Sequence, residues 1–233
     1  MNILQDSEYY QNLMTQPLKI YFAGDLFDSK DLGGNLLLAN AIEEVSDGRY
    51  QIFLPQNGEC EITERTSKSI RDADFELLLK SDLLIANFDG PDLDSGTVVE
   101  FCFAKMVDMP SLLLRTDFRD SGDHTLPDGD PWNLMCSHFP RTAVLHLNAM
   151  TIYHECKNSD IALMLKNFYH RIAAEIVARL DQVVTLPSWL KAEKLSAQYD
   201  LAIASIGGTV GELLTADIRN ETVRRKIRSG LFD

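Results

Sequence analysis

The sequence lacks the patterns that mark membrane and secreted proteins. No uncharged apolar run approaches the roughly 18 to 20 residues that span a bilayer. The opening residues, MNILQDSEYYQ, do not combine a basic segment with the apolar core of a signal peptide. Cysteine is scarce: the four residues Cys60, Cys102, Cys136 and Cys156 form no CxxC pair. We therefore expect a cytoplasmic protein with no membrane partner.

The sequence also has few basic residues and few recognisable ligand motifs. It has 22 Lys and Arg against 35 Asp and Glu, a formal charge of -13, which argues against a nucleic acid polymer as partner. The patterns GxGxxG, GxxxxGK[ST] and GxSxG are absent. The five histidines are scattered without the spacing of metal ligands. We expect small substrates, no cofactor and no bound metal.

What the chain does contain is a regular alternation of apolar strands and amphipathic helices. This order predicts an α/β fold, a Rossmann- or flavodoxin-like doubly wound parallel sheet of about five strands with right-handed crossovers. The strands are expected at 18–27, 50–55, 82–90, 109–118 and 142–150, and the intervening or following helices at 35–47, 67–82, 95–109 and 161–180.

The same reading divides the chain into three parts. Residues 1–17 form a polar N-terminal leader, 18–183 form the α/β domain, and 184–233 form a helical C-terminal extension. Helices are expected within the extension around 188–199 and 209–229. The stretch 119–140 is rich in Asp, Gly and Pro without periodicity, so it is interpreted as a long loop over one face.

Candidate site residues follow the strands, because open parallel sheets bind ligands outside their carboxyl ends. Five acidic residues fall within 82–100, and Glu100 lies inside a helix about one turn past its start. A carboxylate beside a second, protonatable carboxyl group can support substitution at an anomeric carbon. Spacing alone leaves two alternatives open, an acidic metal-binding cluster and a solvated helix glutamate.

Several segments, in order, resemble the nucleoside 2-deoxyribosyltransferase family: KIYFAG, SDLLIAN, DSGTVVEFCFA, RTDFR and NLM. The resemblance covers roughly residues 18–140. Its most specific element is the pattern D-x-G-T-x-x-E followed by alanine four residues later. In this sequence the pattern is formed by Asp94, Gly96, Thr97, Glu100 and Ala104.

The resemblance implies a double-displacement reaction that moves 2-deoxyribose between nucleobases. Glu100 would attack C1′ of the sugar and form a covalent glycosyl intermediate. Tyr21 would orient Glu100, and Asp82 would donate a proton to the departing base. The partners implied are deoxynucleosides and nucleobases.

The resemblance also implies substrate contacts. Asp94 would contact the sugar hydroxyls or the base while capping its helix. Asn133 would reach the 5′-hydroxyl in a neighbouring subunit's site, which implies a homo-oligomer. Gln56 and Gly24, at the ends of the second and first strands, are further candidate substrate contacts.

Two other functions remain open from the sequence. One is an N-glycosidase that hydrolyses deoxynucleosides or deoxynucleoside 5′-monophosphates, which would need a phosphate pocket. The other is a non-catalytic nucleotide-binding module, since fold does not fix function. The anionic Asp94 disfavours a phosphate, and a binding module has no use for a nucleophile such as Glu100.

Overall fold

The computed structural model describes residues 16–58, 62, 65–119 and 129–232. Most of the predicted leader, 1–17, and part of the predicted loop, 119–140, lie outside the described residues. Both predictions are therefore untested over those positions.

The described residues form a five-stranded parallel sheet in the order β2-β1-β3-β4-β5. This confirms the predicted doubly wound α/β fold. The strand order reverses between β1 and β3, and such a switch point opens a crevice at the carboxyl ends of the two strands. The strands are β1 (Leu18–Ala23), β2 (Tyr50–Phe53), β3 (Leu83–Asn87), β4 (Ser111–Arg115) and β5 (Thr142–His146).

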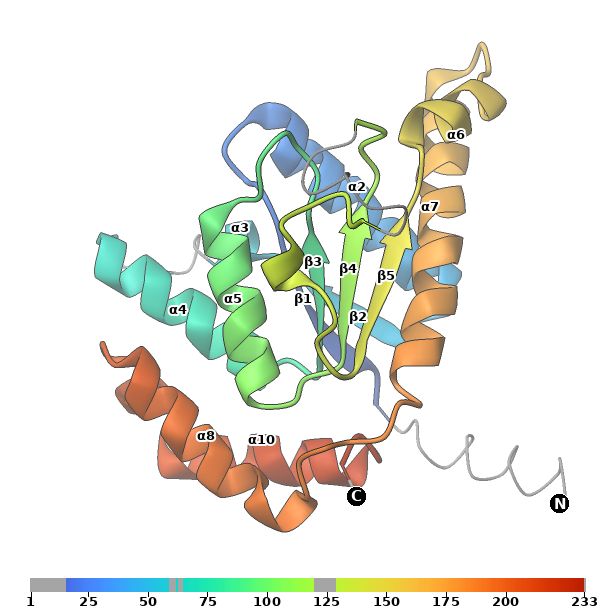
Figure 1. Ribbon diagram of the computed structural model, residues 1–233. Helices are drawn as coiled ribbons and strands as arrows, with labels where there is room; N and C mark the ends of the chain where they lie inside the picture. The colour runs from blue at the N-terminus through green and yellow to red at the C-terminus, as the bar shows by residue number, and fades with distance from the viewer. Residues whose placement is uncertain (1–15, 59–61, 63–64, 120–128, 233) are drawn as a thin grey trace, which may run out of the picture.

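Helices cover both faces of the sheet, so the central strands β3 and β4 are buried almost throughout (Figure 1). One face carries α2 (Ser29–Val45) and α7 (Ile161–Val183), which pack against each other. The other face carries α4 (Ser67–Lys80) and α5 (Ser95–Met106). The strands and these two helix layers enclose the hydrophobic core.

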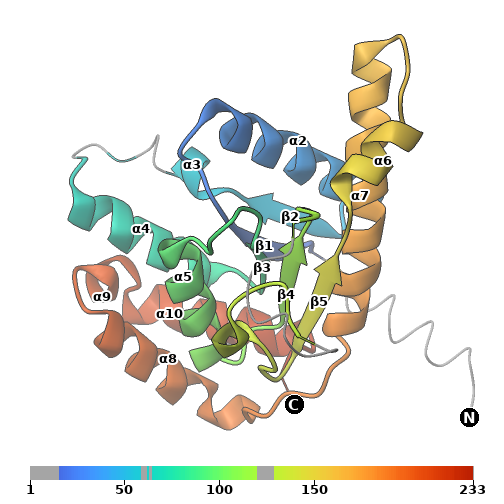
Figure 2. The same cartoon turned by 45° about the horizontal axis from the view of Figure 1, so that its top comes forward.

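The C-terminal helices are α8 (Ala192–Ile206), α9 (Val210–Leu213) and α10 (Ala216–Arg228). They lie beneath the amino ends of the strands, at the edge opposite the arrowheads (Figures 1 and 2). Buried Tyr199 of α8 donates a hydrogen bond to the Leu79 carbonyl at 2.9 Å, and Lys226 of α10 donates to the Ser81 carbonyl. The carboxyl edge, where ligands are expected, is at the opposite end of the strands.

Some element boundaries differ from the sequence prediction. Helix α2 begins at Ser29 rather than at 35, because Asp28 and Asp31 form a reciprocal capping box at its start. Three elements were not predicted: α3 (Pro55–Gly58), α6 (Ala149–Glu155) and a 3-10 turn (Leu134–Cys136). They are too short for periodicity to reveal. No helix in the described ranges is both long and apolar enough to cross a membrane.

Candidate functional site

Glu100 is presented by α5, the helix that follows β3. Asp94 is the N-cap of this helix, and its Oδ2 accepts hydrogen bonds from the Thr97 backbone nitrogen at 2.7 Å and from Thr97 Oγ1 at 2.9 Å. The capping role expected of Asp94 is therefore present. It fixes the first turn of α5 at the carboxyl edge of the sheet, and Glu100 follows on the second turn.

A second strand supplies the hydrogen-bond partner of Glu100. Tyr21 is a buried residue of β1, and its Oη donates to Glu100 Oε1 at 2.5 Å. The strand order places β1 beside β3, so two residues far apart in the chain meet at the switch point. Tyr21 therefore holds one carboxylate oxygen of Glu100, a residue that also lines a cavity.

A cavity of about 580 Å3 opens beside Glu100, between α4 and α5. Its carboxyl groups are Glu100 and Asp74, and its cationic side chain is Arg71, all among the described residues. Two carboxyl groups in one cavity are the arrangement that glycosyl transfer requires. The complete lining is Ser67, Ile70, Arg71, Asp74, Phe75, Ser95, Gly96, Val99 and Glu100.

The surroundings of Glu100 favour its protonated form. Burial raises the pKa of this carboxyl group to about 8, well above its ordinary value of 4.5. The hydrogen bond from Tyr21 lowers the pKa, while the negative charges of Asp74 and Asp94 raise it further. A carboxyl group that titrates near neutral pH inside a cavity is typical of a functional site.

A family model connects this geometry with known proteins. The model described as nucleoside 2-deoxyribosyltransferase matches residues 20–135, from β1 to the 3-10 turn. The chain belongs to the nucleoside 2-deoxyribosyltransferase family. Membership indicates an enzyme that transfers a glycosyl group, and the matched segment contains Tyr21, Asp74 and Glu100 but not the C-terminal helices.

Two solved structures are similar to the chain. A conserved protein from Enterococcus faecalis V583 is 27% identical, with a TM-score of 0.48, covering 67% of this chain and 99% of its own. A 2-deoxyribosyltransferase from Bacillus psychrosaccharolyticus is 17% identical, with a TM-score of 0.43, covering 63% of this chain and 95% of its own. No match was found among the curated proteins.

Asp82 does not lie at the Glu100 cavity. It precedes β3, so it stands at the amino edge, and five residues of strand separate the two edges by about 16 Å. Its buried Oδ2 accepts the Lys19 backbone N–H at 2.8 Å and pairs with Arg225 of α10. The placement does not fit the predicted role of Asp82 as proton donor, which we replace with a structural one.

Asp74 is the residue that the sequence analysis missed. It lies on α4, three residues after Arg71 and one before Phe75, on the helix face that lines the Glu100 cavity. The sequence analysis predicted a helix at 67–82 and assigned no function to the charged residues within it. The available signal was the i, i+3, i+4 grouping of Arg71, Asp74 and Phe75, which places two charged groups beside a buried aromatic ring.

Two predicted substrate contacts end neighbouring strands, outside the lining of the Glu100 cavity. Gln56 lies on α3, and its Nε2 donates to the Leu32 carbonyl at 3.0 Å. Gly24 follows β1, and a Cβ there would lie 3.1 Å from Asn87 Cβ. Close packing against β3 therefore accounts for the glycine, and a substrate contact at either residue stays a prediction.

Asn133 lies in a neighbouring hollow of about 620 Å3 on the outer side of α5. Its Oδ1 accepts the Met135 backbone N–H at 3.0 Å and starts the 3-10 turn. The hollow shares Ser95 and Val99 with the Glu100 cavity. The predicted contact of Asn133 with a neighbouring subunit is not tested by one chain, but the residue is exposed on a surface continuous with the site.

Arg115 and Asp117, which belong to the family-like RTDFR segment, close the end of β4. Buried Arg115 donates to the carbonyls of Phe88, Gly90 and Arg119. Asp117 pairs with Arg119, whose guanidinium lowers the pKa of that carboxyl to about 2. Within the described residues, no group of three or more His, Cys, Asp or Glu side chains could hold a metal ion.

Proposed function

We propose that this protein transfers 2-deoxyribose between nucleobases through a covalent intermediate on Glu100. The observation that carries the proposal is the Tyr21–Glu100 hydrogen bond at a cavity that also contains Asp74. Family membership supplies the reaction class, and these residues supply a nucleophile, a group that orients it and a second carboxyl group.

In the first step, Glu100 Oε2 attacks C1′ of a deoxynucleoside. The bond from C1′ to the base nitrogen breaks through an oxocarbenium-like transition state, and the bonding electrons leave with the base. The sugar is then an ester of Glu100 with inverted configuration at C1′. Tyr21 keeps its hydrogen bond to Oε1, which holds the carboxylate in one orientation during the attack.

The departing base needs a proton, and Asp74 is the group we propose for this transfer. Asp74 lines the same cavity as Glu100, and its charge contributes to the raised pKa of the Glu100 carboxyl. In the reactive state the one proton lies on Asp74 and Glu100 is ionised. Asp74 then protonates the leaving base and later accepts the proton of the incoming base.

In the second step, the incoming base attacks C1′ from the opposite side to Glu100. The ester bond breaks, its electrons return to the Glu100 carboxylate, and the second inversion gives net retention. Transfer rather than hydrolysis requires that the base reaches the intermediate before water does. The buried ring of Phe75 in the cavity wall, with the apolar side chains of Ile70 and Val99, reduces the room for water.

The charges around the cavity favour a nucleoside over a nucleoside 5′-monophosphate. A helix N-terminus is a natural phosphate site, but at α5 the anionic Asp94 carboxylate occupies this end and accepts both hydrogen bonds of Thr97. Arg71 is the cationic side chain that lines the cavity among the described residues, and its guanidinium is bonded to Asp72 and to the Ile206 carbonyl. Hydrolysis of monophosphates is therefore the weaker candidate.

We also propose that the active form is a homo-oligomer in which Asn133 completes a neighbour's site. Leu134 and Met135, beside Asn133, expose 53% and 74% of their surface, which is unusual for such apolar residues. This surface adjoins the hollow that shares Ser95 and Val99 with the Glu100 cavity. A second copy covering it would bury the apolar side chains and bring its own Asn133 toward the site.

The test of base exchange uses deoxyinosine with and without free adenine, with products separated by chromatography. The proposal predicts deoxyadenosine when adenine is present, and little free hypoxanthine when it is absent. The matched variant is Glu100→Gln, which keeps the size of the side chain and removes its charge. Equal release of hypoxanthine in both incubations would identify a hydrolase and contradict transfer.

A further inference from the structure

A buried carboxylate on α4 binds the C-terminal segment, residues 184–232, at the turn between α8 and α9. The Asp72 side chain is fully buried; its Oδ2 accepts hydrogen bonds from the Thr209 backbone nitrogen at 2.6 Å and from Thr209 Oγ1 at 2.7 Å. Its Oδ1 accepts from Arg71 Nη1 at 2.7 Å. Burial would raise the pKa of Asp72, but the bonds from Thr209 and Arg71 outweigh it and lower the pKa. Asp72 is therefore a buried anion whose two carboxylate oxygens both accept hydrogen bonds.

The turn that contains Gly208 and Thr209 packs closely against the Asp72 carboxylate. Gly208 has a φ of +63°, and a Cβ at this position would lie 2.4 Å from Asp72 Oδ1. Any larger residue would push the segment away from α4 and would also be strained by its backbone conformation. The close contact between Asp72 and the 207–209 turn thus depends on glycine at position 208.

Arg71 extends this contact to the wall of the Glu100 cavity. Its second guanidinium nitrogen, Nη2, donates to the Ile206 carbonyl at 2.8 Å, at the end of α8. The guanidinium carbon lies 4.9 Å from the centre of the Phe75 ring. Arg71 and Phe75 both line the Glu100 cavity, so the C-terminal segment reaches that wall through a single side chain.

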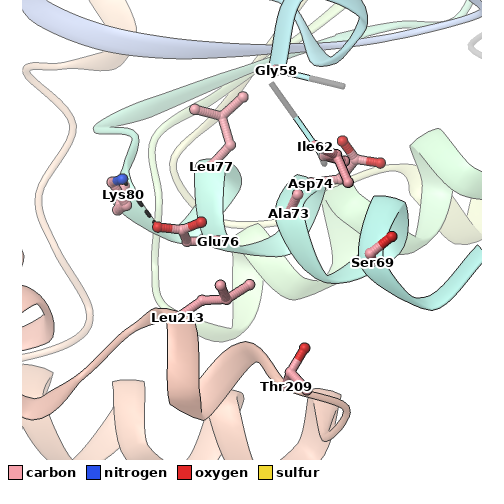
Figure 3. Close-up of a pocket in the computed structure, with 10 residues that line it drawn as sticks. All are labelled: Gly58, Ile62, Ser69, Ala73, Asp74, Glu76, Leu77, Lys80, Thr209 and Leu213. Carbon is pink, nitrogen blue, oxygen red and sulfur yellow. Dashed lines mark hydrogen bonds and ion pairs between the residues drawn. The ribbon is translucent and has the colours of Figure 1, made fainter. Parts of the chain in front are cut away.

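The turn of α4 that carries Asp72 and Asp74 also borders a second cavity, of about 460 Å3 (Figure 3). Thr209 and Leu213 of the C-terminal segment border it below α4, while Asp74 lies on the side of α4 toward Ile62. Asp74 lines both this cavity and the Glu100 cavity. The turn of α4 that carries Asp74 therefore borders two cavities, and buried Asp72 on the same turn bonds it to the C-terminal segment.

We propose that Asp72 is a positioning residue: by binding Thr209 and Arg71, it fixes the turn of α4 that places Asp74 beside Glu100. The inference rests on the proposed function in taking the Glu100 cavity as the active site. It assigns a role to the C-terminal segment, which lies outside the matched family region. The C-terminal segment holds Asp74, the proposed proton-transfer residue, in place, although the segment itself does not line the Glu100 cavity.

The proposal predicts an effect on the titration of Glu100. The charged and titratable groups facing Glu100 are Tyr21 from β1, Asp74 and Arg71 from α4, and Asp94 at the start of α5. Because the charge of Asp74 raises the pKa of Glu100, a displacement of Asp74 away from Glu100 lowers that pKa. A purely structural contact would change stability without changing this titration.

The test compares four variants of the full chain. Asp72→Asn removes the charge, and Thr209→Val is the milder change because it removes only the hydroxyl hydrogen bond. Thr209→Ser keeps both bonds and serves as the conservative control. Gln198→Ala removes another bond of the C-terminal segment, from Gln198 Nε2 to the Met106 carbonyl at 2.7 Å, away from the cavity.

The main readout is the pKa of Glu100 by carbon NMR of labelled glutamate, which needs no turnover. We expect Thr209→Val and Asp72→Asn to lower this pKa and to reduce kcat of base exchange about tenfold, with a smaller change in KM. Thr209→Ser and Gln198→Ala should match the wild type in both. If Thr209→Val lowers only the melting temperature and leaves the Glu100 pKa unchanged, Asp72 is not a positioning residue. If base exchange is absent from the wild type, the proposed function fails, whereas the titration still decides this inference.

Discussion

The phenol of Tyr21 donates a 2.5 Å hydrogen bond to the carboxylate of Glu100, joining β1 to α5 at the switch point of the sheet. The bond favours the ionised form of a carboxyl group that burial otherwise keeps protonated. The nucleophile of the proposed reaction therefore depends on one hydroxyl group, which makes this pair the most informative place to begin mutagenesis.

Tyr21→Phe should shift the pH dependence of the reaction. Because the hydrogen bond lowers the pKa of Glu100, its loss raises that pKa further above 8. A hydrogen bond to a charged group contributes about 1.5 to 3 kcal/mol, so kcat/KM at neutral pH should fall roughly ten- to a hundredfold. The measurement is kcat/KM against pH, whose acid limb lies near pH 8 in the wild type and higher in the variant. An unchanged acid limb would show that the bond does not control ionisation.

Glu100→Gln should make the protein more stable at alkaline pH. The folded-state pKa of about 8 is above the unfolded value near 4.5, so the stability contributed by protonated Glu100 is present below pH 4.5 and is lost as pH rises through 8. The glutamine variant keeps a neutral side chain throughout. Its free energy of unfolding above pH 8 should exceed that of the wild type by at least about 1.4 kcal/mol, one pKa unit, after allowance for solvent screening. Urea denaturation at pH 5 and pH 9 measures the difference, and a gap that does not widen with pH would contradict the raised pKa.

Two aspartates near β3 should respond differently to mutation. Asp74→Asn removes the proposed proton donor and should lower kcat at least tenfold with little effect on stability. Asp82→Asn breaks a buried pair with Arg225 and should cost about 3 to 5 kcal/mol of stability while leaving kcat of the folded protein near the wild-type value. Thermal melts and steady-state kinetics on both variants separate the two effects. Loss of turnover in folded Asp82→Asn protein would return Asp82 to the active site.

Subunit mixing tests the proposed role of Asn133. If Asn133 acts in a neighbour's site, Asn133→Ala and Glu100→Ala should each be nearly inactive alone. When the two variants are mixed and allowed to exchange subunits, some sites combine an intact Glu100 with an intact Asn133 from the other copy. Activity that appears only after mixing supports the shared site. A mixture as inactive as its components would place Asn133 within its own subunit's chemistry or outside it.

Much of the fold was predictable because the spacing of apolar residues distinguishes strands from helices. The buried run of β3 and the amphipathic pattern of α7 depend on local sequence alone. Glu100 could be predicted because it belongs to a compact motif with Asp94 and Thr97, whose capping bonds are local.

Features that depend on long-range contacts were harder to predict. Asp74 joins the site only because α4 and α5 pack side by side. Its local grouping with Arg71 and Phe75 marks one helix face but does not show which element that face meets. Asp82 was assigned to the site from the family resemblance, but it precedes β3 and therefore stands at the amino edge of the sheet, away from Glu100. The burial of Asp72 by Thr209 spans 137 residues and follows from the path of the C-terminal segment.

The central claim is a covalent bond between deoxyribose and Glu100, and mass spectrometry of an acid-quenched reaction tests it directly. Protein mixed with deoxyinosine without an acceptor base should gain the mass of one deoxyribosyl group on the peptide that contains Glu100. The label should disappear when adenine is added before quenching, and it should be absent from the Glu100→Gln variant. Turnover by the wild type with no labelled peptide, or a label on another residue, would contradict the account.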